Sequence, residues 1–172
     1  AAPIQRSIMN RDKESGISIM KINENLDEGP VCNQYSLKIS EKMNAEELSE
    51  KLSLIASEKI LYILDNIYDG NLEFKDQDHS KATYAKKIQK LEGKINWNEN
   101  ADNIIGKING LYPYPGAFFS FNGERYKILK AEKSSTTGKP GEIVSENFEV
   151  CCVGGSIKVL SIQREGKRVQ QI

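Results

Sequence analysis

The stretch Tyr112-Pro113-Tyr114-Pro115-Gly116 divides this sequence into two parts with different patterns. Two prolines so close together cannot continue a helix, so an extended turn is predicted there. After it, short strands are predicted at 117–121, 124–133, 142–145, 148–153 and 156–164. Asn122-Gly123 and Gly154-Gly155 are typical of tight turns between strands. Five short strands in this space favour a small antiparallel barrel of the OB type.

Before that turn the pattern combines strands with helices. Alternating apolar residues at 17–22 predict a strand, a polar loop follows, and a second strand is predicted at 31–39. Asn44, with Glu47 three residues later, matches a capping box and predicts a helix over 45–68.

Two shorter helices flank these elements. Pro3 is expected to start the first, and Asn98 is expected to cap the second, which ends at Gly110. Residues 71–95 are polar and rich in lysine, so they are interpreted as a connector.

The first part of the chain makes a poor core by itself. Two strands alone are marginal in water, and the long predicted helix has a broad apolar face that needs a larger sheet. Residue 1 is also Ala rather than Met. We therefore expect the chain to begin inside a domain, with further strands upstream.

Composition excludes several classes of protein. The 172 residues are 38% hydrophobic and 28% charged, and 24 Lys and Arg balance 24 Asp and Glu, which argues against disorder, collagen or a coiled coil. No apolar run approaches the roughly 18 residues that span a bilayer.

The three cysteines form no CxxC, which favours a reduced, cytoplasmic compartment over disulfides or zinc. His79, the only histidine, is expected in a solvated loop, so no metal site is expected.

Several segments, taken in order over almost the whole chain, resemble the methionyl-tRNA formyltransferases. Residues 1–6 resemble the helix that follows that family's folate-loop motif. Ser15-Gly16-Ile17-Ser18-Ile19-Met20 and then Leu26-Asp27-Glu28-Gly29-Pro30 are similar to the loop that carries its catalytic aspartate. Residues 83–88, 94–97 and 112–117 resemble that family's linker and the start of its C-terminal domain. Residues 163–168 resemble its last strand.

The resemblance implies a fold and an activity. The fold is a partial α/β formyltransferase (Rossmann-like) domain at 1–72, a linker at 73–95, and a small all-β OB-like domain at 96–172 that binds tRNA. The reaction transfers a formyl group from 10-formyltetrahydrofolate to the α-amino group of initiator methionyl-tRNA, in the cytoplasm, for translation initiation. No metal, membrane or DNA partner is implied.

Catalysis in the family uses an Asn, a His and an Asp, and only the Asp has a counterpart here, Asp27. The Asn, the His and the folate-binding loop are expected upstream of residue 1, so the chain alone is expected to be inactive. The resemblance assigns Asp27 to orienting and charging the His or relaying a proton through water. Without the resemblance, Asp27 is better interpreted as a turn aspartate that bonds the local backbone. The flanking Asn25, Leu26 and Glu28 are expected to line the pterin site.

Basic residues of the second part are candidates for tRNA phosphate contacts. Strict strand alternation places Lys127 and Lys133 on one face and Lys130 on the other. Arg164, Lys167 and Arg168 are favoured because Gly166 indicates a turn that presents their charges. A solvated surface of mixed charge is the alternative for each of them.

Two other functions are compatible with the sequence. The layout also resembles enzymes that formylate an amino-sugar nucleotide, although 1–6 and 26–30 are closer to the tRNA enzymes. A non-catalytic RNA-binding module that uses only the barrel is the second alternative.

Overall fold

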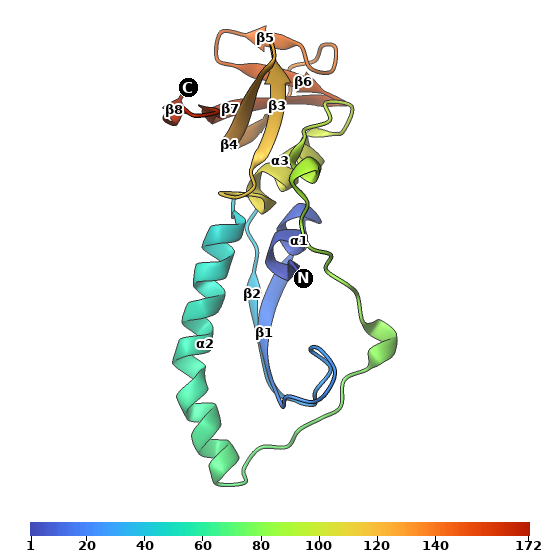
Figure 1. Ribbon diagram of the computed structural model, residues 1–172, viewed down its shortest axis with the longest axis vertical. Helices are drawn as coiled ribbons and strands as arrows, with labels where there is room; N and C mark the ends of the chain where they lie inside the picture. Colours follow the sequence, from blue (N-terminus) through green and yellow to red (C-terminus); the bar gives the residue numbers. More distant parts are fainter.

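The structure is a computed structural model that describes residues 1–172. The first half holds α1 (Pro3–Met9), β1 (Glu14–Met20), β2 (Val31–Lys38) and α2 (Ala45–Tyr68). The short 3₁₀ helices η1 (His79–Lys81) and η2 (Lys90–Gly93) lie in the connector. The second half holds α3 (Ala101–Gly110), β3 (Ala117–Phe121), β4 (Glu124–Ser134), β5 (Ile143–Ser145), β6 (Glu149–Cys152), β7 (Gly155–Arg164) and β8 (Gln170–Gln171). Figure 1 shows the halves stacked end to end, with α1 and α3 between them.

The first half is built on the antiparallel pair β1–β2, which is joined in register from Glu14↔Lys38 to Met20↔Val31. The predicted capping box begins α2, because Asn44 Oδ1 accepts from Glu47 N at 2.9 Å and Glu47 Oε2 accepts from Asn44 N at 3.1 Å. The helix bounds are those that the sequence predicts. Leu48 and Leu52 of α2 pack with Ile8 and Met43 in a small core.

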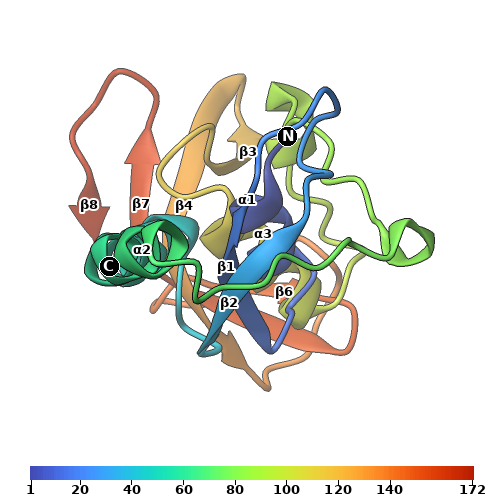
Figure 2. The ribbon, with the colours of Figure 1, turned by 90° about the horizontal axis from the view of Figure 1, so that it is seen from below.

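The far end of α2 keeps much of its apolar surface in solvent. Figure 2 shows α2 almost end-on, with β1 and β2 to one side of it. Its exposed apolar side chains are Leu54, Ile60, Leu61, Tyr62, Leu64, Ile67 and Tyr68. The small core and this exposed face agree with the expectation that two strands cannot cover so long a helix. No helix combines the length and the apolar character needed to cross a membrane.

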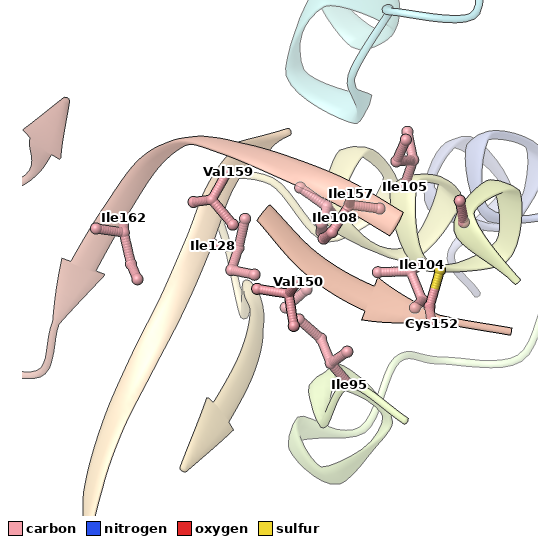
Figure 3. Packing of buried hydrophobic residues seen from close by; sticks show 12 residues of the cluster. Ile95, Ile104, Ile105, Ile108, Ile128, Val150, Cys152, Ile157, Val159 and Ile162 are labelled. Carbon is pink, nitrogen blue, oxygen red and sulfur yellow. The ribbon is translucent and has the colours of Figure 1, made fainter. Parts of the chain in front are cut away.

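The second half is a six-stranded antiparallel sheet in the order β3-β4-β7-β6-β5, with β8 beside β7. The five predicted strands are confirmed within a residue or two, and β8 is an additional strand. Helix α3 packs on this sheet, and Figure 3 shows Ile104 and Ile108 of the helix pointing toward residues of the strands. Asn100, not Asn98, caps α3, since Asn100 Oδ1 accepts from Asn103 N at 2.8 Å whereas Asn98 N bonds Asn96 Oδ1 in the preceding turn.

The path of this sheet is open, because no strand pairing joins β3 to β5. The segment leading into α3 contacts one end strand of the path and the end of β6. Ile95 N donates to Phe118 O of β3 at 2.7 Å, and Val153 N, just after β6, donates to Glu99 O at 3.1 Å. The order of elements in the chain gives the predicted coarse arrangement, an α/β part followed by a mostly β part.

The halves meet where α1 crosses α3. Gly110 of α3 lies so close to α1 that an added Cβ would stand 2.5 Å from Met9 Cγ and 2.9 Å from Gln5 O. Beside this crossing, the Asp102 carboxylate accepts from Arg11 Nη2 at 3.2 Å and from Lys133 Nζ at 2.6 Å. The hydrogen bond from Lys133 lowers the pKa of Asp102, which therefore stays ionised near neutral pH.

Candidate functional site

The loop at 21–30 joins β1 to β2 and carries Asp27. Its neck is closed by the hydrogen bond from Lys21 N to Pro30 O at 2.9 Å. Gly29 is buried in this neck, where a Cβ would stand 1.7 Å from Lys21 O, so only glycine fits. Asp27 adopts a φ of 59°, in the left-handed region that aspartate enters more readily than most residues.

The connector passes directly beside this loop. Val31 and Lys75 form an antiparallel bridge, with N–O distances of 2.8 Å and 2.9 Å. Two residues further on, Gln77 Nε2 donates to Asp27 O at 2.9 Å and to Gly29 O at 2.7 Å. The Lys21 ammonium stands 4.2 Å from the centroid of the Phe74 ring. The loop and the connector therefore form one structural unit.

Between the loop, β2 and the connector lies an open cleft of about 660 Å³. Its charged and polar lining residues are Asp27, Glu28, Asn33, Gln34, Lys75, Asp76, Gln77, Asp78, His79 and Lys81. Hydrogen bonds from Ser80 and Lys81 lower the pKa of Asp78, which is therefore ionised at neutral pH. The buried Asn33 Oδ1 has no hydrogen-bond partner. The lining offers carboxylates, cations and amides to a polar molecule.

Only two of the four site residues predicted in this loop line the cleft. Asp27 and Glu28 line the cleft, whereas Asn25 and Leu26 do not. Leu26 is 78% exposed, and Asn25 N donates to Asn23 Oδ1 at 3.1 Å within the loop. His79 is exposed, as the sequence predicts, and it lines the same cleft without a hydrogen bond to Asp27.

The predicted basic residues differ in their surroundings. Lys130 and Lys133 together line a second cavity of about 460 Å³, beside Arg11 and Lys42 at the meeting of the halves. The pairing of β4 with β7 shifts register between Ile128 and Ala131, next to Lys130. The cavity is lined by the four consecutive residues 130–133, so both faces of the strand contribute to it, and the placement of Lys130 opposite Lys133 stays a prediction.

The remaining basic residues differ in the partners of their side chains. The Lys127 ammonium lies 5.9 Å from the centroid of the Tyr114 ring. Arg164 is paired with the Glu124 carboxylate, as Lys133 is with Asp102. Lys167 and Arg168 are exposed in the turn after β7, where Gly166 has a φ of 71°, and neither forms an ion pair. Their positive charges are therefore unpaired, as is that of the exposed Lys130.

Sequence reasoning missed Gln77, Arg11 and Asp102. Gln77 lies in a polar connector without periodicity, so nothing local marks it as a partner of the Asp27 loop. In the sequence, Asp102 is indistinguishable from the acidic residues that commonly occupy the first turn of a helix. Its two cationic partners come from distant segments that only the fold brings together.

Comparison with known proteins gives a consistent picture. The family model described as formyl transferase matches residues 1–64, and the one described as formyl transferase, C-terminal domain, matches residues 87–172. A protein of Pelagibacter ubique named methionyl-tRNA formyltransferase is 60% identical over 100% of this chain and 56% of its own length. The chain thus spans about half the length of the curated relatives it matches.

Two solved structures share the fold at low identity. HypX from Aquifex aeolicus, in complex with tetrahydrofolic acid, superimposes with a TM-score of 0.76 at 16% identity, over 100% of this chain and 31% of that one. An N-formyltransferase from Helicobacter canadensis, in complex with folinic acid and dTDP-3-aminofucose, gives a TM-score of 0.75 at 19% identity, over 95% and 61% of the two chains. With both family models matched in order, the chain belongs to the formyl transferase family.

Proposed function

We propose that the protein containing this chain transfers a formyl group from 10-formyltetrahydrofolate to the α-amino group of initiator methionyl-tRNA, in the cytoplasm, for translation initiation. The observation that carries the proposal is the 60% identity, along the entire chain, to a protein named methionyl-tRNA formyltransferase. The folate donor is supported by the tetrahydrofolic acid bound to HypX, which shares the fold.

In this proposal Asp27 takes part in the chemical step. The methionyl amine attacks the formyl carbon, a new C–N bond forms, and the bond from that carbon to the folate nitrogen breaks as that nitrogen takes up a proton. The attacking amine must lose a proton, while the carbonyl oxygen passes through an oxyanion. Asp27 would receive that proton through water or orient a histidine that does. An Asn and a His outside these 172 residues would stabilise the oxyanion.

The loop and the second half take separate binding roles. Glu28, which lines the cleft, and the exposed Asn25 and Leu26 would contact the folate from the loop and its rim. Residues 1–72 would act as part of the catalytic domain, 73–95 as the linker and 96–172 as the tRNA-binding domain. We propose that the six-stranded sheet, together with the segment before α3, forms an OB-like barrel. Its phosphate contacts would be Lys127, Lys130, Lys133, Arg164, Lys167 and Arg168.

The acceptor can be tested with a chimera in which this chain replaces the matching 173-residue part of the Pelagibacter ubique relative. We expect formyl transfer to initiator methionyl-tRNA, measured as formylmethionine released after deacylation. The neighbour bound to dTDP-3-aminofucose makes an amino-sugar nucleotide the second candidate acceptor. Formylation of the sugar nucleotide and not of the tRNA would replace our proposal with that function. If the chimera binds tRNA and formylates neither acceptor, a non-catalytic RNA-binding role is favoured.

Lys167 and Arg168 give a prediction for tRNA binding. Each phosphate contact releases counterions, so the logarithm of the binding constant falls with the logarithm of the salt concentration by roughly 0.7 to 0.9 per contact. Lys167→Ala together with Arg168→Ala should therefore flatten that slope by about 1.5 in the chimera. Lys51→Ala, at an exposed site on α2, should leave the slope unchanged. An unaltered slope in the double variant would remove these two residues from the tRNA surface.

A further inference from the structure

The loop that carries Asp27 depends on one side chain from elsewhere in the chain. Residues 22–29 accept no hydrogen bond from outside the loop except those from Gln77. Gln77 Nε2 donates to two carbonyls, Asp27 O at 2.9 Å and Gly29 O at 2.7 Å, and it also lies 3.9 Å from Met20 Sδ at the end of β1. The two carbonyl oxygens are the shorter and stronger acceptors, so the two hydrogens of this amide mainly hold the loop.

The backbone of Asp27 needs such support. Its φ of 59° lies in the left-handed region, which costs free energy for residues other than glycine. Such conformations persist when surrounding contacts hold them. The carbonyl that Gln77 binds belongs to Asp27 itself, so the hydrogen bond fixes the peptide from which the carboxylate projects. Asp27 lines the cleft, and its fixed backbone limits the rotamers that its carboxylate can adopt there.

The segment that presents Gln77 is anchored on both sides. Before it, Lys75 pairs with Val31 at the start of β2. After it, Asp78 Oδ1 accepts from Ser80 N at 3.1 Å and from Ser80 Oγ at 2.6 Å, which begins η1. Gln77 is therefore presented from a fixed backbone, as a positioning group must be.

We propose that Gln77 is a positioning residue for formyl transfer, which holds the Asp27 carboxylate in its reactive orientation through the Asp27 and Gly29 carbonyls. The inference rests on the proposed role of Asp27. Gln77 does not touch the substrate in this account, so it acts on the rate of the chemical step and not on substrate binding. It also makes the connector between the halves part of the active site.

The test uses Gln77→Met in the chimera, because methionine keeps the length and neutrality of glutamine and removes both donors. We expect kcat to fall by about 10- to 100-fold, the range that a small misplacement of a reacting group produces, with KM for both substrates within about twofold. Gln77→Asn keeps the amide and is one methylene too short to reach both carbonyls, so its kcat should fall between those of Gln77→Met and the wild type. Gln89→Met, at an exposed position of the same connector, is the matched control and should leave kcat unchanged.

A second measurement on the 172-residue chain follows the loop directly. Amide hydrogen exchange in Gln77→Met should become faster at Lys21, Asn25 and Val31, whose amides are hydrogen-bonded in the loop and at its neck, and remain unchanged in β4 and α3. Exchange that rises throughout the chain, or an unaltered loop, would overturn the inference. So would an unchanged kcat in Gln77→Met where Asp27→Asn is inactive. If Asp27→Asn is itself fully active, the proposed function fails, and the exchange measurement still decides whether Gln77 holds the loop.

Discussion

Asp27→Asn in the chimera is expected to lower formyl transfer to initiator methionyl-tRNA by about 10²- to 10⁴-fold, the range for losing a general acid–base group. Asparagine has nearly the same shape and also tolerates the left-handed backbone that Asp27 adopts at a φ of 59°. Because the side chain is exposed, the substitution should not change the thermal midpoint of unfolding. Single-turnover formylation, with pre-bound folate and tRNA, separates this loss from a binding defect.

Asp76→Asn is the matched control for that experiment, since Asp76 is an exposed carboxylate lining the same cleft. A drop of less than about threefold is expected there, because the field of one exposed charge is largely screened by solvent. Near-normal turnover in Asp27→Asn would refute the catalytic role. An equal loss in both variants would instead indicate that the cleft needs its total negative charge.

Gly110→Ala is expected to destabilise the chain by about 1–3 kcal/mol, although alanine is the better helix former. In an unobstructed helix this change would stabilise by about 0.5–1 kcal/mol. Here the new Cβ would stand 2.5 Å from Met9 Cγ and 2.9 Å from the carbonyl oxygen of Gln5, so α1 must move away from α3. Overpacking of this kind outweighs the gain in helix propensity.

The measurement for Gly110→Ala is the urea midpoint of the chain, with Asn103→Ala as control. Asn103 lies on the exposed side of the same helix, so its replacement by alanine should be neutral or slightly stabilising. A Gly110→Ala midpoint equal to or above that of the wild type would mean that α1 and α3 do not approach each other so closely in solution.

Local signals in the sequence predict much of this fold. The capping box at Asn44 and the Asn122-Gly123 turn depend on neighbours within a few residues, and each is found as predicted. The alternation at 17–22 also predicts a strand, which the structure places at Glu14–Met20. The register shift in β4 beside Lys130 is not predicted, because it arises from pairing with the distant strand β7. The cap of α3 is Asn100 rather than the predicted Asn98, two residues earlier and of the same residue type, and the hydrogen bond from Asn103 N distinguishes them.

The candidate site is likewise predicted only in part by the sequence. Asp27 and its loop are found through a contiguous motif, and the loop does line a cleft. Gln77 lies 50 positions further along the chain and contacts the loop only because the connector returns past β2. Composition and periodicity describe neighbours in sequence, and so they carry no information on a contact of that kind.

The connector meets the first half at several places besides Gln77. Ala2 N donates to Ala85 O at 3.0 Å, Arg6 Nε donates to Lys86 O at 3.0 Å, and the Arg6 guanidinium binds Glu92 at 2.6 Å. The hydrogen bond from Arg6 lowers the pKa of Glu92, so this clamp persists until the medium becomes acidic. The connector is thereby held against α1, which itself packs on α3 of the second half. The spacing between the loop that carries Asp27 and the six-stranded sheet is thus set by packed helices and hydrogen bonds.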